Sequence, residues 1–238
     1  MSRAYKSKGF TLVEVTIILL VLVILSAILL PVIERYIDLA RYVKCREDIG
    51  MIAAIIELFK VDTCGTCLKI WGDIPSCTGN QIDLLVSDGN IASCIGPSTS
   101  LWGQQYGDNH AMFFVDTMTN QLALGDPFGP TSPGNPYPRP YTAFGCGWRG
   151  AYISTPITGD PWGNRYMVNV AFLGNCVGGS GMTGGRCFGM TPLQYSRMDV
   201  FVLSAGPDGT VHTPFAMEGV VAQGDDQIAL ISGNSGSL

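Results

Sequence analysis

The longest apolar stretch of the chain lies close to its N-terminus. Residues 10–33 carry a single charge, at Glu14, and the nineteen residues of 15–33 carry none. As an α-helix rising 1.5 Å per residue, those nineteen residues would extend about 28 Å, close to the hydrocarbon thickness of a bilayer. No later stretch combines this length with this apolarity. The pattern therefore predicts one transmembrane helix.

Past residue 33 the pattern changes to apolar positions spaced mostly three or four residues apart, with charged residues between them. This period predicts that the helix continues as an amphipathic segment over 34–60. A helix over 10–60 would be about 76 Å long, so we expect its outer half to pack on the chain's own globular part. A helix lying on the membrane surface is the alternative, but its polar face should then be strongly basic, and this one carries both signs. The apolar positions are Ile33, Ile37, Ala40, Val43, Ile49, Ile52, Ile56 and Phe59.

The rest of the chain predicts short strands separated by loops. We divide it into a cysteine- and proline-rich insertion over 61–145 and a sheet region over 146–238. The strand signals are apolar or β-branched runs bounded by glycine, proline, asparagine and aspartate. Two of them form a predicted hairpin around Thr119-Asn120. The predicted strands cover 112–116, 121–124, 165–172, 199–204 and 227–232.

Composition agrees with a loop-rich α+β protein. Among 238 residues there are 30 glycines and 14 prolines, and only 14% of residues are charged, against roughly 25% in typical soluble domains. The formal net charge is −5 and the sequence pI is near 4.9. This acidic balance argues against nucleic-acid binding, which depends on neutralising phosphates.

The residues before the apolar stretch determine its orientation. Arg3, Lys6 and Lys8 are basic, and residues 1–9 contain no acid. Positive charge beside a span stays on the cytoplasmic side, so everything after the span is predicted to be exported. A secretory signal peptide would be cut after its apolar core.

Residues 8–15, KGFTLVEV, instead resemble the type III signal of type IV prepilins and pseudopilins. The resemblance implies that a prepilin peptidase cuts between Gly9 and Phe10 and that the new amino terminus of Phe10 is methylated. It also implies assembly roles for Phe10, Glu14 and the helix-kinking Pro31. Without the three basic residues of the leader, the mature chain would carry a net charge of −8.

Glu14 has a physical case of its own. A carboxylate inside a membrane span costs roughly 2.5–3.5 kcal/mol on insertion scales, so such residues usually have a partner or a function. If cleavage frees the Phe10 amine, Glu14 of one subunit could neutralise it on the next subunit and set the axial register. The alternative is an acid that reaches the membrane edge without a partner.

A second resemblance lies in residues 147–168, GWRGAYISTPITGDPWGNRYMV. They resemble the core of the major pseudopilin of type II secretion systems, through Tyr152 and the Asp-Pro-Trp-Gly turn of 160–163, although Ala151 replaces the family's proline. Asp-Pro sets a turn, and Trp162 supplies a large apolar body to pack on the sheet. A ligand-binding role for this tryptophan is the alternative.

The turn after the predicted strand 199–204 resembles the calcium loop of the same pseudopilins. Calcium takes six to eight oxygen ligands from carboxylates and carbonyls. The stretch between the first and second acidic positions is longer than in the family and contains hydrophobic residues, and an Asp-Gly turn without metal is the alternative. The implied ligands are Asp208, one of Asp225 and Asp226, and the carbonyls of Ala205 and Thr210, with Glu218 as a further candidate.

Eight cysteines in an exported chain predict disulfides. Cys77–Cys94 and Cys176–Cys187 close short loops and are the preferred pairs, although eight cysteines allow 105 pairings. A zinc site, or redox chemistry at Cys64 and Cys67, stays open as an alternative. Covalent haem attachment would need a histidine directly after the second of these cysteines, where the chain has leucine.

The sequence predicts no catalytic site. The glycine-rich loop over 174–189 lacks the lysine and following helix of a phosphate-binding loop. His110 and His212 belong to no nucleophile or acid–base arrangement and are expected to be surface residues. We therefore expect a protein that is not an enzyme.

Together, the resemblances imply a ladle-shaped α+β fold, with a long N-terminal helix packed on a small antiparallel sheet. They imply a subunit that polymerises with copies of itself, anchored in the inner membrane with its C-terminal part in the periplasm before assembly. The resemblances lead first to the expectation of a type II secretion pseudopilin. The alternative is a type IV pilin displayed on the cell surface for adhesion, twitching motility or DNA uptake. Implied partners are the prepilin peptidase, an assembly ATPase, an inner-membrane platform protein and minor pilins or pseudopilins. A monomeric membrane-tethered redox or binding protein is a further alternative.

Overall fold

The computed structural model describes residues 9–64, 68–69, 81–104, 113–127, 129, 136–140, 145–173, 190 and 192–231. Residues 1–8 of the predicted leader, Cys77, Cys176 and Cys187 lie outside the described residues. The chain divides into two compact units, Met1–Val43 and Lys44–Leu238.

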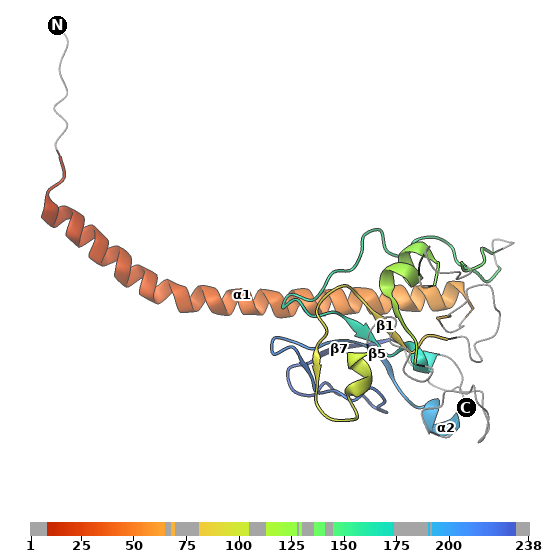
Figure 1. The fold of residues 1–238 in the computed structure, drawn as a ribbon. Helices are drawn as coiled ribbons and strands as arrows, with labels where there is room; N and C mark the ends of the chain where they lie inside the picture. Colours follow the sequence, from red (N-terminus) through yellow and green to blue (C-terminus); the bar gives the residue numbers. More distant parts are fainter. Residues whose placement is uncertain are drawn as a thin grey trace, which may run out of the picture. The chain divides into compact units, whose positions relative to one another are not determined.

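The predicted N-terminal helix is confirmed as α1, Leu12–Asp62, a helix of 51 residues with Pro31 in its interior (Figure 1). Its membrane-length apolar part lies in the first unit, where the residues up to Ile33 are all exposed. Among the described residues, α1 is the helix long and apolar enough to cross a membrane. An unburied apolar surface of this size needs a non-aqueous environment or a protein partner.

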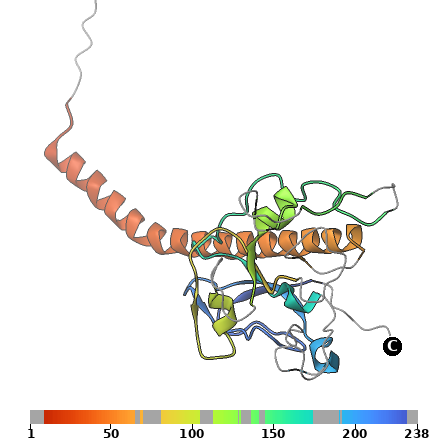
Figure 2. The same cartoon turned by 45° about the vertical axis from the view of Figure 1, so that its right-hand side comes forward.

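In the second unit, the C-terminal part of α1 runs alongside the strands (Figures 1 and 2). This part of the helix carries one buried stripe. Most successive buried positions are three or four residues apart, so they fall on one face of the helix. This face joins the hydrophobic core formed with the sheet, which confirms the predicted amphipathic half. Burial raises the pKa of the Cys45 thiol to about 11. The buried positions are Cys45, Ile49, Ile52, Ala53, Ile56 and Phe59.

The central sheet has five strands in the order β3-β1-β4-β5-β7. β1 and β3 pair in parallel, and the other neighbours pair antiparallel. The sheet is therefore mixed, and the predicted all-antiparallel sheet is wrong in this respect. The strands are β1 (Leu84–Val86), β3 (Val115–Thr117), β4 (Met167–Val168), β5 (Val200–Ser204) and β7 (Gln227–Ile231).

Two parallel strands, β2 (Ser93–Cys94) and β6 (Thr210–Val211), form a second sheet. Short helical turns complete the described elements. The region 61–145 thus supplies two strands of the central sheet and one strand of the small sheet, in addition to loops. The turns are η1 (Ser100–Gly103), η2 (Thr119–Leu124), η3 (Val170–Leu173) and α2 (Pro192–Tyr195).

The predicted hairpin around Thr119-Asn120 is wrong, because η2 is a π-helix. The buried Asp116 carboxylate accepts hydrogen bonds from Asn120 Nδ2 at 2.7 Å and from Gln121 Nε2 at 2.6 Å. These two bonds stabilise the coiled conformation directly after β3. Side-chain bonds to nearby groups compete in this way with strand pairing.

The predicted strand over 165–172 is shorter than expected. β4 ends at Val168, because hydrogen bonds from the Asn169 side chain replace strand pairing beyond this residue. Its Nδ2 donates to the carbonyls of Asp199 and Phe215, both at 2.9 Å, and its Oδ1 accepts from Phe201 N at 2.8 Å. The predicted strands at 199–204 and 227–232 are confirmed as β5 and β7.

The Asp-Pro-Trp-Gly turn is fastened to the end of β5. Asp160 Oδ1 accepts hydrogen bonds from the backbone N–H groups of Trp162 at 3.0 Å and Asn164 at 2.9 Å. Asp160 Oδ2 accepts from Ser204 Oγ at 2.6 Å. Trp162 is half-buried and packs against the core, which agrees with its predicted packing role.

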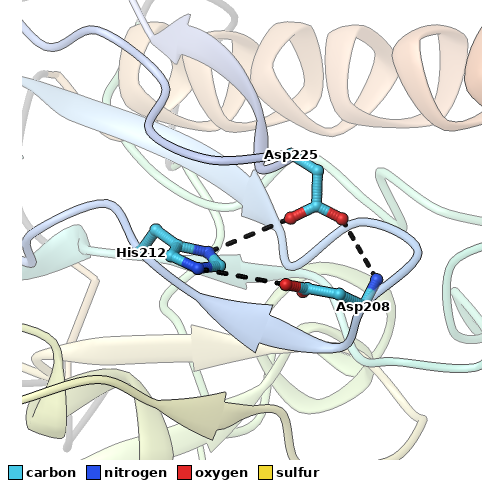
Figure 3. A group of neighbouring side chains, drawn as sticks. All are labelled: Asp208, His212 and Asp225. Atoms are coloured by element: carbon cyan, nitrogen blue, oxygen red, sulfur yellow. Dashed lines mark hydrogen bonds and ion pairs between the residues drawn. The ribbon is translucent and has the colours of Figure 1, made fainter.

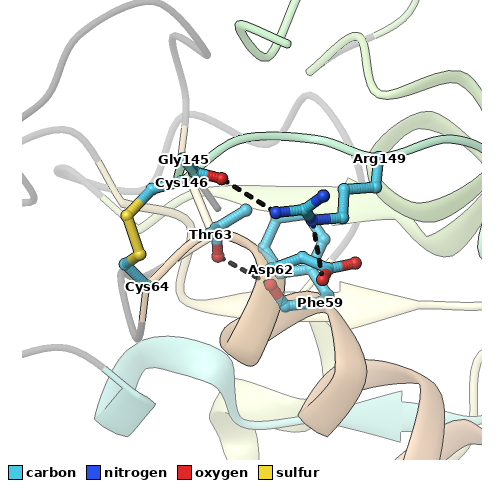
Figure 4. The surroundings of a disulfide bond; sticks show 7 residues. All are labelled: Phe59, Asp62, Thr63, Cys64, Gly145, Cys146 and Arg149. Atoms are coloured by element: carbon cyan, nitrogen blue, oxygen red, sulfur yellow. Dashed lines mark hydrogen bonds and ion pairs between the residues drawn. A yellow bond between two sulfur atoms is a disulfide. The ribbon is translucent and has the colours of Figure 1, made fainter. Parts of the chain in front are cut away.

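A disulfide joins Cys64, just past the end of α1, to Cys146, 82 residues later (Figure 4). Polar contacts surround it: Arg149 Nε lies 3.2 Å from Asp62 Oδ1, and Tyr152 donates its hydroxyl proton to Asp62 Oδ2 at 3.0 Å. Together they fix the C-terminal end of α1 to the segment that precedes the Asp-Pro-Trp-Gly turn.

The preferred cysteine pairs did not include this disulfide. Cys94 is a free, half-buried thiol in β2, and Cys77, its predicted partner, lies outside the described residues. Cys94 is paired in register with Val211 of β6, and its sulfur faces the position of Gly103, where an added Cβ would lie 3.3 Å away. Burial raises the pKa of this thiol. In this disulfide, the partner of Cys64 is Cys146, and Cys64 offers no free thiolate as a zinc ligand.

Candidate metal centre

The turn between β5 and β6 presents the first predicted ligand, Asp208. Gly206 and Gly209 flank it, both with φ of +66°, a conformation that glycine adopts without steric cost. A side chain at Gly206 would also collide with the backbone of Asp225, since an added Cβ would lie 2.5 Å from its carbonyl oxygen. The close approach allows Asp208 N to donate to Asp225 Oδ2 at 3.1 Å. The fold thus brings two predicted ligands together across seventeen residues of sequence.

His212 completes the cluster, as Figure 3 shows. Its Nε2 lies 3.9 Å from Asp208 Oδ2, and its Nδ1 lies 3.9 Å from Asp225 Oδ1. One potential ligand atom from each of the three residues lies within 4.8 Å of the others. His212 was not among the ligands predicted from the sequence. Its position four residues after Asp208, directly beyond a short strand, was the available signal.

Asp226, the other candidate for the second acidic ligand, is held outside the cluster. It is buried, and its Oδ2 accepts hydrogen bonds from His212 N at 2.9 Å and Thr213 N at 2.7 Å. Burial raises the pKa of this carboxyl, although the same hydrogen bonds oppose the rise. Asp226 therefore stabilises the backbone behind the cluster, and Asp225 is the acid that faces Asp208.

The remaining implied ligands differ in their placement. Ser93 N and Ile95 N bond to the carbonyls of Gly209 and Val211, so the Thr210 carbonyl between them points away from β2. Ala205 is buried at the end of β5. Glu218 is exposed and does not belong to the cluster.

The donor set fits a divalent cation only in part. Asp208 and Asp225 supply the carboxylate oxygens that calcium prefers, but calcium needs six to eight oxygens, which carbonyls and water would have to complete. The two nitrogens of His212 face different carboxylates, so one ion can use only one of them. Imidazole suits zinc and similar metals better than calcium. Calcium at this turn stays a prediction.

Calcium binding is testable by thermal unfolding of the full chain in detergent. If millimolar calcium is about ten times its Kd, linkage gives about 1.4 kcal/mol of stabilisation, which corresponds to a rise in Tm of about 4 °C for a domain of this size. Asp208→Asn should abolish the rise, whereas Glu218→Gln, at an exposed acid outside the cluster, should retain it. A wild-type Tm that does not move with calcium would remove calcium from the site.

The predicted processing and assembly residues lie at the start of α1. Gly9 and Phe10 are exposed and precede the helix. Thr11 is followed three residues later by Glu14, and the two form a capping box. Glu14 N bonds to Thr11 Oγ1 at 3.3 Å, and Glu14 Oε2 accepts from Thr11 N at 2.8 Å and Thr11 Oγ1 at 2.9 Å. Glu14 therefore has a local structural role that the sequence analysis missed, although the Thr-x-x-Glu spacing was visible.

Comparison with known proteins gives no further guide: no protein-family model, no curated protein and no solved structure matches the chain.

Proposed function

We propose that the chain is a structural subunit of a type IV pilus-like filament, anchored in the membrane by α1 before assembly. The observation that carries the proposal is the start of α1. An apolar, unburied helix of membrane length begins directly after Gly9-Phe10 and has one carboxylate, Glu14, in its first turn. The helix cap that Glu14 makes does not require a charge, since glutamine also serves at this position, and a charge is costly in a bilayer.

The arrangement supports polymerisation through the apolar half of α1. Its exposed side chains need a partner once the helix leaves the bilayer, and a second copy of the same helix offers a matching surface. Repetition of one head-to-tail contact then generates a helical filament. The implied partners would be further copies of this chain, a prepilin peptidase, an assembly ATPase and platform protein, and minor subunits.

Within this class we propose a type II secretion pseudopilin that works in the periplasm. The Asp-Pro-Trp-Gly turn anchored on Ser204 and the acidic turn at Asp208 support this choice. The second candidate, a surface pilin, draws support from the size of the region closed by the Cys64–Cys146 disulfide. The disulfide itself fits both candidates, since the periplasm and the cell exterior are both oxidising.

Intact mass spectrometry of the protein from its native cell tests the proposal. We expect a mass that lacks residues 1–9 and carries one added methyl group. Washed envelopes and sheared surface appendages are measured separately. Confinement to envelopes supports the pseudopilin, and abundance in the sheared fraction supports the surface pilin. An uncleaved chain in both fractions would contradict a filament role of either kind.

A further inference from the structure

A basic pocket lies apart from the acidic turn and from the start of α1. Its volume is about 320 Å³, and Arg139, Pro140, Trp148, Arg149 and Gly150 line it. The chain has a net charge of −5, so two guanidinium groups beside one indole ring stand out from the general charge of the molecule. This combination supplies positive charge and an apolar wall in one concave place, which is typical of small-ligand sites.

The indole wall is held in position by the backbone. Trp148 N donates to the Pro138 carbonyl at 2.9 Å, and the neighbouring Gly147 N donates to the Asp62 carbonyl at 2.9 Å. Gly125 packs directly on the ring, because an added Cβ there would lie 2.5 Å from Trp148 Cε2. Tyr152 contacts the same ring edge-on, with centroids 6.2 Å apart. The ring therefore needs no reordering when a ligand binds.

The two arginines differ in how they are placed. Arg149 is fixed by the contact of its Nε with Asp62 Oδ1 and by the hydrogen bond that its Nη2 donates to the Gly145 carbonyl at 3.0 Å (Figure 4). Arg139 is exposed and makes no ion pair within the described ranges. The exposed guanidinium of Arg139 therefore gives the pocket a positive charge in addition to the Arg149–Asp62 pair.

We propose that this pocket binds a carboxylate-bearing saccharide of the uronic-acid class. A guanidinium group matches a carboxylate with two parallel hydrogen bonds, and Arg139 is placed to provide them. The indole of Trp148 offers an apolar face for the C–H face of a sugar ring. The volume suits one or two sugar rings. An extended acidic peptide is less favoured, since the described residues that line the pocket belong to no strand or helix that could offer the edge or groove that peptides use.

Binding is tested with the full chain in detergent, titrated with a hexamer of polyguluronate and, as the neutral probe, with maltohexaose. This proposal does not depend on filament formation, so its result is separate from the mass measurement above. We expect saturable binding of the uronate oligomer alone. Arg139→Gln should weaken it about tenfold or more, the usual effect of losing a hydrogen bond to a charged group. Arg197→Gln, at another exposed arginine, should leave it unchanged.

Trp148→Phe separates stacking from charge. It keeps an aromatic ring but reduces the apolar face, so it should weaken binding of the uronate oligomer. Binding of acetate, a carboxylate probe without a sugar ring, should not change. The proposal is overturned if the uronate oligomer does not bind, if maltohexaose binds equally, or if Arg139→Gln and Arg197→Gln have the same effect. Tighter binding of a glutamate hexapeptide than of the uronate oligomer would assign the pocket to an acidic peptide instead.

Discussion

Glu14→Ala is expected to abolish filament assembly while leader cleavage continues. The substitution removes the one charge in the apolar half of α1 that could neutralise the freed amine of Phe10 on a neighbouring subunit. It leaves Gly9 and Phe10, the cleavage site, intact. The measurement is the filament yield in sheared or envelope fractions, with intact mass reporting cleavage in the same samples.

A glutamine at the same position separates the charge from the helix cap. Glu14 accepts two hydrogen bonds from Thr11, and glutamine also serves at this position of a capping box. Glu14→Gln should therefore retain the cap and still fail to assemble. Thr11→Ala, which removes the hydroxyl but not the charge, should assemble with a yield reduced only by the loss of a cap, worth roughly 1 kcal/mol.

Either variant can refute the charge-pair hypothesis. If Glu14→Gln forms filaments at the wild-type yield, the carboxylate charge has no role in assembly. If Thr11→Ala fails as completely as Glu14→Ala, the cap is the required feature. Uncleaved chain in Glu14→Ala would instead place this residue in recognition by the peptidase.

The paired substitution Cys64→Ser with Cys146→Ser is expected to lower the free energy of unfolding by about 4.5 kcal/mol. Loop-closure entropy for a separation of 82 residues gives a value of this size, because the cross-link restricts the unfolded chain. Replacing both cysteines avoids a new unpaired thiol. Denaturant unfolding of the full chain in detergent provides the measurement.

Cys94→Ser is the matched control, since Cys94 is a free, half-buried thiol. We expect it to change stability far less than the paired substitution. A second test uses Arg149→Gln, which keeps the disulfide but removes the partly exposed ion pair with Asp62 and should cost at most about 1 kcal/mol. If the paired variant is as stable as Cys94→Ser, the disulfide does not stabilise the end of α1.

Much of the fold could be predicted because it depends on local periodicity. The run of apolar residues and the three-to-four spacing after residue 33 predict α1 to within two residues at either end. β5 and β7 are likewise visible as apolar runs bounded by turn residues. The acidic turn at Asp208 was located from a resemblance, and its Gly206 and Gly209 have the conformation that only glycine adopts easily.

Other features depend on contacts between distant residues. The partner of Cys64 is 82 residues away, and no local pattern selects it among the possible pairs. The parallel pairing of β1 with β3 follows from how the chain crosses the sheet, and the short length of these strands gives a weak sequence signal. At the acidic turn, Asp225 and Asp226 are neighbours in sequence, and the backbone N–H groups of His212 and Thr213 decide which one faces Asp208.

The sequence by itself therefore determined the long helix, its apolar and amphipathic halves, the single carboxylate in its first turn and two strands of the sheet. These features follow from side-chain periods that repeat within a few residues. Only the tertiary structure decided the disulfide, the mixed order of the sheet, the π-helix after β3 and the members of the acidic cluster. For each of these features, the local sequence allows several conformations or pairings of similar free energy. Contacts between residues that are tens of positions apart determine which one forms.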